Sequence, residues 1–297
     1  MRRWAVLLNE RSGGADEHVR PAIEAAMRSG GSDWFPVEVG EGESASEKIC
    51  SLDRDSFDGL IVAGGDGTVM EAVNGLMRYR IDVPLAIVPT GTANFVARAL
   101  DVPQDASEAL AIAMAGSIRR IDIGQCGTRF FALGVGLGLA ERFVTATEEG
   151  EKRRLGPWAY LLTLIREVRT PNAVFVLERP DGTKEQLEGV AMVVANAAGL
   201  GNGHAISREV LPDDGLLDVV ILHRLSSIDA CRLAIRALGG NLTRDRVVTH
   251  RQGREFTLHS RPKVPIQIDG DDVPQTLPLR VTIHPLSLSV FVRPKFT

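Results

Sequence analysis

Short apolar runs alternate with segments of helical spacing over the first 120 residues. The apolar run at 58–63 ends abruptly at Gly-Gly-Asp-Gly-Thr (64–68), and apolar residues then recur with helical spacing through residue 79. This pattern predicts a strand, a glycine turn and a helix. An Asp-Gly hairpin turn is the alternative, but a second strand would not show helical spacing.

The same unit recurs along this part of the chain. The predicted strands are 4–8, 34–39, 58–63, 84–89 and 118–123, and the predicted helices are 16–29, 44–54 (capped by Ser44), 68–79, a segment reaching Leu100, and 105–115. Such alternation predicts a parallel α/β sheet with ligand chemistry at the carboxyl ends of the strands. Polar or glycine-rich turns at 9–14, 64–68 and 90–94 would then converge on one edge, where backbone N–H groups can bind phosphate.

The pattern changes after about residue 125. Short β-branched segments bounded by turns predict strands at 129–133, 173–179, 188–195, 216–222, 255–259, 264–269, 279–284 and 288–292, with helices at 138–148, 155–169 and 226–238. We therefore predict two domains, an α/β domain at 1–125 and a mostly antiparallel β domain at 126–297.

Composition narrows the class of protein. The net charge of −4 and an aromatic content of 5% argue against nucleic-acid binding. Three well-separated cysteines predict buried free thiols in a reducing compartment. No apolar run reaches the roughly 18–20 residues that span a bilayer, and the first apolar run is too short for a signal peptide. We expect a cytoplasmic protein that touches membranes peripherally at most.

Two acidic clusters are candidates for chemistry. The cluster 211–218 fits either a β-turn with Asp218 in solvent or a hard-cation site made of a carboxylate and turn carbonyls. The cluster 268–272 is most simply a hairpin turn. The spacing of the glycines at 134–138 is wrong for a dinucleotide-binding turn and fits close packing or a lipid-pocket wall better. Walker A, protein-kinase, GxSxG and HExxH motifs are absent from the sequence, which excludes the classes they mark.

Taken together, the motifs resemble the diacylglycerol kinase catalytic family, which includes sphingosine and ceramide kinases and many bacterial lipid kinases. The matching segments are Asn9 with Ser12-Gly13, Gly64–Thr68, Pro89–Asn94 with Ala97-Arg98, Asp214–Asp218 and Asp269-Gly270, in the order of the family. Gly-Gly-Asp-Gly-Thr alone is shared with NAD kinases. Its pairing with Gly-Thr-Ala-Asn and a late Asp-Gly is specific for the lipid-kinase branch.

The resemblance implies an α/β ATP-binding domain and a β-rich lipid-substrate domain, with the active site in the cleft and the C-terminal tail returning to the first domain. It implies an enzyme that transfers the ATP γ-phosphate to a hydroxyl of a lipid such as diacylglycerol and that uses Mg²⁺ as cofactor. The enzyme would meet its lipid at a membrane surface and take part in phospholipid synthesis. Two alternatives stay open: an NAD kinase-like enzyme acting on a soluble hydroxyl, and a non-catalytic relative that binds lipid or nucleotide. The sequence indicates neither the lipid nor the oligomeric state.

The resemblance also implies roles for individual residues. Those placed around the nucleotide are Asn9, Gly64, Gly65, Asp66, Gly67, Thr68, Gly91, Thr92 and Asn94. Asp66 would engage the Mg²⁺-phosphate unit, and Asp122, ending a strand, would join a magnesium–water network. The structural Mg²⁺ ligands would be Asp214 and the carbonyl oxygens of Leu211 and Leu216.

The general base would be Asp271, at a position where the family usually has glutamate. Aspartate is one methylene shorter, so catalysis requires the backbone to close that gap. Two further positions depart from the family: Glu10 replaces a common proline, and Phe95 stands where many members have aspartate. The departures at Asp271 and Phe95 motivate the non-catalytic alternative.

Overall fold

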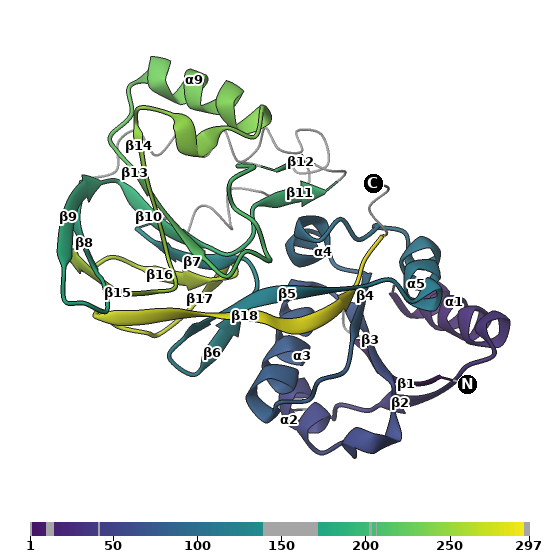
Figure 1. Ribbon diagram of the computed structural model, residues 1–297. Coiled ribbons are helices and arrows are strands. Elements are labelled where there is room, and N and C mark those ends of the chain that lie inside the picture. Colours follow the sequence, from purple (N-terminus) through teal and green to yellow (C-terminus); the bar gives the residue numbers. More distant parts are fainter. Residues whose placement is uncertain are drawn as a thin grey trace. The chain divides into compact units, whose positions relative to one another are not determined.

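The computed structural model describes residues 2–9, 15–40, 42–138, 172–201, 204–205 and 207–293 (Figure 1). The chain forms two compact units: unit 1 comprises Met1–Ile123, Gly201–Gly203 and Pro285–Thr297, and unit 2 comprises Gly124–Leu200 and His204–His284. Strands β5 (Ile118–Cys126) and β18 (Leu279–Phe291) each contribute residues to both units. The predicted fold class, an α/β part followed by a β-rich part, is confirmed.

Unit 1 is built on a parallel sheet. Its strands are β1 (Arg3–Leu8), β2 (Asp33–Val37), β3 (Gly59–Gly64) and β4 (Leu85–Pro89), in the order β2-β1-β3-β4, and β18 joins parallel to β4 by pairing Val290 with Leu85. Its helices are α1 (Ala15–Gly30), α2 (Ala45–Cys50), α3 (Asp66–Tyr79), α4 (Phe95–Ala99) and α5 (Ala106–Ala115). Because parallel strands end at one edge, the turns after β3 and β4 meet there, together with Asn9, the residue that follows β1.

The burial of the strands explains the continuous apolar runs in the sequence of unit 1. All six residues of β3 and all five of β4 are buried, as expected for central parallel strands covered on both faces. The amphipathic helix α1 contributes Val19 and Ile23 to the core beside this sheet, and the largely apolar helix α5 contributes Leu110. The predicted helix 44–54 is too long, since α2 ends at Cys50 and Arg54–Ser56 form a separate 3₁₀ turn whose N-terminus is capped by the Asp53 side chain.

Unit 2 consists of antiparallel strands around a second core. One sheet has the order β14-β13-β10-β7-β16-β17, and the other runs β18-β15-β8-β9 in this unit. The strands are β6 (Arg129–Phe131), β7 (Gly134–Leu137), β8 (Ala173–Glu178), β9 (Lys184–Gly189), β10 (Ala191–Ala195), β11 (Gly199–Gly201), β12 (His204–Ala205), β13 (Leu217–Leu222), β14 (Val248–Gly253), β15 (Glu255–Arg261), β16 (Ile266–Ile268) and β17 (Asp271–Asp272). Helix α9 (Ser227–Leu238) packs on a smaller apolar cluster, followed by a 3₁₀ turn at Leu242–Arg244.

Several sequence predictions for unit 2 are corrected. The segments 279–284 and 288–292 form one strand, β18, which passes through Pro285 and Leu286, the latter with a positive φ of 47°. The predicted strand 188–195 is divided between β9 and β10. The predicted helices at 138–148 and 155–169 fall almost entirely outside the described residues. The close-packing interpretation of 134–138 is confirmed, because a Cβ atom at Gly134 would lie 2.5 Å from the Val194 carbonyl oxygen.

The structure bears on two further predictions, the lack of a membrane-spanning helix and the burial of the cysteines. Within the described part of the chain, no helix is both long and apolar enough to cross a bilayer. The cysteines are free, but only Cys126 is buried, whereas Cys50 is half-buried and Cys231 is exposed. Burial raises the pKa of the Cys126 thiol to about 11, which keeps it protonated at neutral pH.

Candidate active site

The turn at 64–68 is a strand-to-helix turn, so the hairpin alternative is wrong. β3 ends at Gly64, Gly65 is the N-cap residue of α3, and no side chain of the described residues caps this helix. The first-turn N–H groups of an α-helix have no partner within the helix, and they carry the positive end of its dipole. The start of α3 is therefore a favourable place for an anionic group.

A second glycine turn lies directly against the first. Thr90 N donates to the Gly64 carbonyl oxygen at 3.1 Å. A Cβ atom at Gly91 would lie 2.6 Å from the Cα of Gly65, a distance that side-chain carbons do not tolerate. Only glycine at position 91 lets the two backbones approach this closely. The sequence-predicted turns at 64–68 and 90–94 are thus brought together in unit 1.

Asn94 fixes the shape of the second turn. It adopts a left-handed conformation (φ 49°) and is buried. Its Oδ1 accepts from Gly91 N at 3.0 Å, and its Nδ2 donates to the Gly91 carbonyl at 2.8 Å and to Gln104 Oε1 at 3.1 Å. The side chain therefore holds Gly91 in place, while Thr92 lies exposed in the turn.

Asp66 and Asn9 tie neighbouring segments to the first turn. Asp66 Oδ1 accepts a hydrogen bond from Val96 N at 2.9 Å and so anchors the start of α4. Asn9 Nδ2 donates to Thr68 Oγ1 at 2.7 Å, and its backbone N–H donates to the Ala63 carbonyl at 3.0 Å. The nine residues predicted around a nucleotide thus lie in three neighbouring segments that contact one another. Ser12 and Gly13, which belong to the first motif, lie outside the described residues.

Asp122 does not end a strand, contrary to the prediction. It is the fifth residue of the nine-residue strand β5 and is fully buried. Its Oδ1 accepts a hydrogen bond from Leu286 N at 2.6 Å, at the left-handed residue of β18. The strand continues past Ile123 because Gly124, Gln125 and Cys126 pair with β6.

In unit 2, Asp269 and Gly270 form a two-residue turn between β16 and β17, which confirms the predicted hairpin. Both residues have positive φ values, 50° and 90°, as a tight hairpin turn requires. Asp271 follows in β17, where it pairs with Ile268. Its exposed carboxylate forms an ion pair with Arg129, with 2.5 Å between Oδ2 and Nη2.

The Asp269 carboxylate binds three consecutive backbone N–H groups. Its Oδ2 accepts from Ala132 and its Oδ1 from Leu133 and Gly134, each at 2.9 Å. Desolvation raises the pKa of this carboxyl to about 6, although the three N–H donors act to lower the pKa. This contact fixes the turn that carries Asp271 to the segment between β6 and β7.

We predict that Asp269→Asn lowers the unfolding free energy by about 1–3 kcal/mol, because the new amide N–H₂ would face the Ala132 N–H without an acceptor. Asparagine is a fair test because it tolerates the left-handed conformation. A carboxyl whose folded pKa is raised stabilises the fold most below its ordinary pKa, and this stabilisation is lost as pH rises toward 6. Urea unfolding should therefore show a larger advantage of wild type at pH 4 than at pH 7. An advantage that grows with pH would contradict the direction of the shift.

The acidic cluster at 211–218 has features of a cation site. Asp214 Oδ1 accepts from Leu216 N at 2.9 Å, which shapes the turn, and Leu211 is exposed. Asp218 is fully buried rather than in solvent, and its Oδ1 accepts hydrogen bonds from His250 and Gln252. Its Oδ2 has no hydrogen-bond partner among the residues that the structure describes. Burial, together with the Asp214 charge, raises the Asp218 pKa. A cation near both carboxylates would satisfy Oδ2 and offset their repulsion.

Carboxylate and carbonyl oxygens are ligands that suit Mg²⁺, so the residues predicted for a structural Mg²⁺ fit this ion. Among the residues that the structure describes, no three His, Cys, Asp or Glu side chains gather into a metal cluster. Sequence reasoning missed two participants. Arg129 carried no signal, because its partner follows 142 residues later. Asp218 was considered only as a solvated residue or as part of the turn.

The fold and the site define a protein with an α/β unit that carries two packed glycine turns and a second unit that is rich in β-strands. Residues 3–126 match the family described as "Diacylglycerol kinase catalytic domain", and residues 135–292 match the "YegS C-terminal NAD kinase beta sandwich-like domain". The chain belongs to the diacylglycerol kinase catalytic family, in the branch that carries this C-terminal domain.

Named relatives agree with this membership. A Pseudomonas aeruginosa protein named "Probable lipid kinase YegS-like" is 35% identical over 208 residues, which are 70% of this chain and 68% of the relative. The diacylglycerol kinase of Bacillus subtilis is 29% identical over 216 residues, covering 72% of this chain and 71% of the relative. A crystal structure of a diacylglycerol kinase from Bacillus anthracis superimposes with a TM-score of 0.77 at 25% identity, covering 99% and 97% of the two chains.

Proposed function

We propose that this protein is an ATP-dependent lipid kinase that transfers the γ-phosphate to a hydroxyl of a lipid such as diacylglycerol. The observation that carries the proposal is the contact of Gly91 with Gly65 beside the uncapped start of α3. Two glycine backbones in contact leave no side chain between an incoming phosphate and the N–H groups. Such a cradle favours a polyphosphate over an apolar ligand.

The residues of unit 1 receive the following roles in the proposal. Backbone N–H groups of Gly65, Gly67 and Thr68 bind the ATP phosphates, and Asn9 orients the Thr68 hydroxyl. Thr92 and Asn94 contact the nucleotide, and Asn94 also holds Gly91. Asp66 can hold Mg²⁺ through the carboxylate oxygen that does not bind Val96, with Asp122 in the same network.

When bound, Mg²⁺ supplies positive charge that offsets the charge of the transferring phosphate. The second ion site comprises Asp214, Asp218 and the carbonyl oxygens of Leu211 and Leu216, and its role is structural. Both assignments follow the chemistry of the donor atoms, because carboxylates and carbonyls are hard ligands.

Asp271 is the proposed general base. The lipid hydroxyl oxygen attacks the γ-phosphorus in line, the bond from that phosphorus to the β–γ bridging oxygen breaks, ADP leaves, and the carboxylate of Asp271 accepts the hydroxyl proton. Arg129 positions this carboxylate through the ion pair, and Asp269 fixes the turn behind it. The proposal assigns nucleotide binding to unit 1 and the general base to unit 2, and the lipid is met at a membrane surface.

A kinase assay tests this function. Purified protein with radiolabelled ATP, Mg²⁺ and a panel of lipids in detergent micelles should label at least one lipid, and Asp66→Ala should remove most of the label. Asp66→Asn is the companion variant, since it keeps an acceptor for Val96 N but loses the charge. Asp55→Ala, at an exposed aspartate of unit 1, should leave the rate unchanged.

The outcomes separate the alternatives. Absence of lipid label with wild type, or undiminished label with Asp66→Ala, would exclude the proposed function. Formation of NADP from NAD in the same reaction would indicate an NAD kinase-like enzyme. ATP binding without phosphorylation of any lipid, unchanged by Asp271→Glu, would indicate a binding protein.

A further inference from the structure

Helix α9 presents two different faces. Its inner face packs Ala230 and Leu233, both buried, against an apolar cluster that includes Leu225 and Val247. The helix begins with a capping box, in which the Ser226 and Asp229 side chains bond each other's backbone N–H groups. These contacts define which side of the helix faces away from the core.

The outer face carries the two most exposed large hydrophobic side chains of the described residues. Ile228 is 77% exposed and Ile235 is 70% exposed, whereas the next value is 49% for Ile118. The two isoleucines are seven residues apart, and the exposed Cys231 lies between them, so the three occupy one stripe of the helix. Large apolar side chains exposed together commonly mark an interaction surface.

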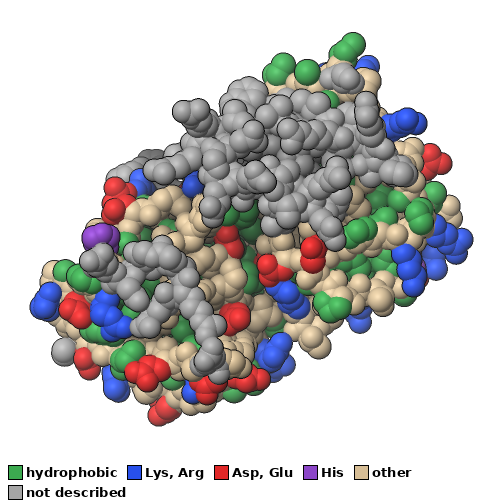
Figure 2. Space-filling view, turned by 180° about the vertical axis from the view of Figure 1, so that it is seen from behind, with side chains coloured by type: hydrophobic (Ala, Val, Ile, Leu, Met, Phe, Trp, Pro, Cys, Tyr) green, Lys and Arg blue, Asp and Glu red, His purple; other side chains and the backbone are tan. Residues whose placement is uncertain are grey.

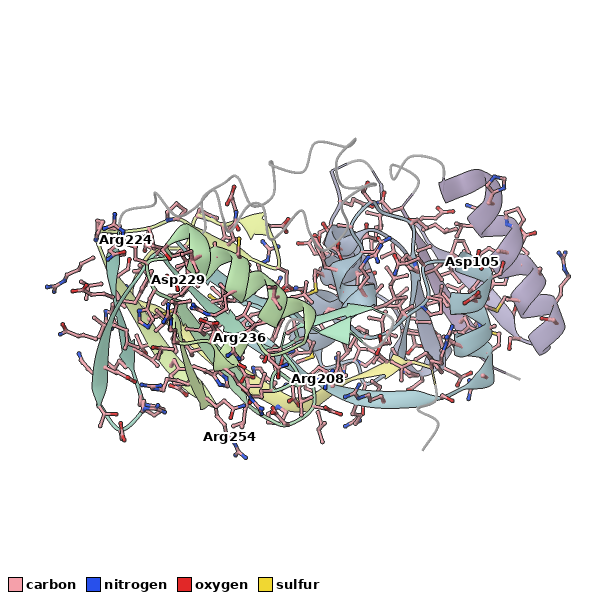
Figure 3. The ribbon with its side chains drawn as sticks, turned by 90° about the horizontal axis from the view of Figure 1, so that it is seen from above. Asp105, Arg208, Arg224, Asp229, Arg236 and Arg254 are labelled. Carbon is pink, nitrogen blue, oxygen red and sulfur yellow. The ribbon has the colours of Figure 1, made fainter. Side chains whose placement is uncertain are left out.

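Arginines surround this stripe. Residues 224–246 contain five arginines and two aspartates, a formal charge of +3 in a chain whose net charge is −4. Arg224 lies beside the start of the helix, and Arg236 and Arg208 lie toward its other end (Figure 3). α9 is the uppermost element in Figure 1, and at that height Figure 2 shows hydrophobic atoms projecting beside Lys and Arg atoms.

Acidic side chains pair with four of these five arginines, including Arg244 with Glu209. Asp229 and Asp245 are paired with Arg232, Arg236 and Arg246. Arg224 and Arg208 are exposed and form no ion pair among the described residues. These two guanidinium groups are therefore available to anions outside the chain.

We propose that the outer face of α9, comprising Ile228, Cys231 and Ile235 with Arg224 and Arg208, docks on the surface of an anionic phospholipid bilayer. Isoleucines can enter the boundary between headgroups and acyl chains, while the arginines bind anionic headgroups. Charge complementarity favours this occupant over a second copy of the same positively charged face. The inference deepens the proposed function, because it assigns the surface by which a lipid kinase would reach its substrate.

Vesicle sedimentation without ATP tests the docking independently of catalysis. Full-length protein should sediment with phosphatidylcholine vesicles that contain phosphatidylglycerol, and less with phosphatidylcholine alone or at high salt. Replacing both Ile228 and Ile235 with serine should weaken binding by about tenfold or more. Arg224→Gln should weaken binding about fivefold.

Matched variants control for general effects. Val39→Ser with Ile118→Ser removes two exposed hydrophobic side chains from unit 1, and Arg254→Gln removes an exposed arginine elsewhere in unit 2. Both controls should bind vesicles as wild type does. Unchanged binding by the Ile228/Ile235 variant would overturn the proposal. The proposal would also be overturned if the wild type sediments as a dimer, the Ile228/Ile235 variant sediments as a monomer, and the variant still binds vesicles. That result would show that the outer face of α9 binds a second copy of the chain.

The two proposals can fail separately. If vesicle binding depends on α9 but no lipid is phosphorylated, the docking proposal is retained and the kinase proposal is excluded. Phosphorylation of lipid in micelles without α9-dependent vesicle binding would retain the kinase and exclude this surface.

Discussion

Asp271→Asn is expected to lower the rate of lipid phosphorylation by about 10²–10⁴-fold, the usual contribution of a general base. The amide keeps the size of the side chain but cannot accept the hydroxyl proton, and it loses the charge that pairs with Arg129. The measurement is the initial rate with saturating ATP in micelles, together with the KM for ATP. A general base affects kcat much more than this KM.

Asp271→Glu is the informative companion. It restores the side chain that the family usually has at this position, so it should retain activity far above that of Asp271→Asn. Thermal unfolding of both variants should match wild type, because the carboxylate is exposed and surface ion pairs contribute little to stability. An Asp271→Asn enzyme with the wild-type kcat would assign the proton transfer to another group.

Gly91→Ala is expected to abolish nucleotide binding and to lower the unfolding free energy by about 1–3 kcal/mol. The added Cβ would lie 2.6 Å from Gly65 Cα and 2.8 Å from Asn94 Oδ1, so the two turns must separate. Separation moves the start of α3 away from its neighbour and breaks the hydrogen bonds from Asn94 to Gly91. Urea unfolding and ATP titration by calorimetry measure the two effects.

Gly67→Ala is the matched control for stability. It adds the same methyl group two residues from Gly65, within the first turn of α3, where a Cβ atom meets nothing within 4 Å. Alanine in a helix is more stable than glycine by about 1 kcal/mol, so the unfolding free energy should stay equal or rise. Equal destabilisation by Gly91→Ala and Gly67→Ala would show that contact between the turns is not the cause.

The sequence predicted unit 1 well because its signals are local. Central parallel strands are continuous apolar runs, and those of β3 and β4 end at glycine or proline, so strand positions are read directly from the sequence. Gly64–Thr68 and Thr90–Asn94 were also readable as turns. Their mutual contact was inferred only from the rule that parallel strands end at one edge.

The errors arise where a residue's environment depends on distant partners. Asp122 was placed at the end of a strand because the apolar run stops at Ile123, yet pairing with β6 extends β5 to Cys126. The sequence predicts two strands, at 279–284 and 288–292, but they form one strand, β18, in which Leu286 N donates a hydrogen bond to Asp122 Oδ1 at the bend. Asp218 is buried because His250 and Gln252 arrive from β14, more than thirty residues later.

The path of β18 has a consequence for the order in which the protein can fold during synthesis. Val290 pairs with Leu85 of β4, and Phe291 lies in the unit 1 core with its ring 5.3 Å from that of Trp4. These contacts join residues about two hundred or more positions apart, so unit 1 cannot be completed when its first 123 residues leave the ribosome. The parallel sheet of unit 1 is completed only when β18 emerges. Until then the edge of β4 remains an unpaired strand edge, the kind of surface that chaperones protect.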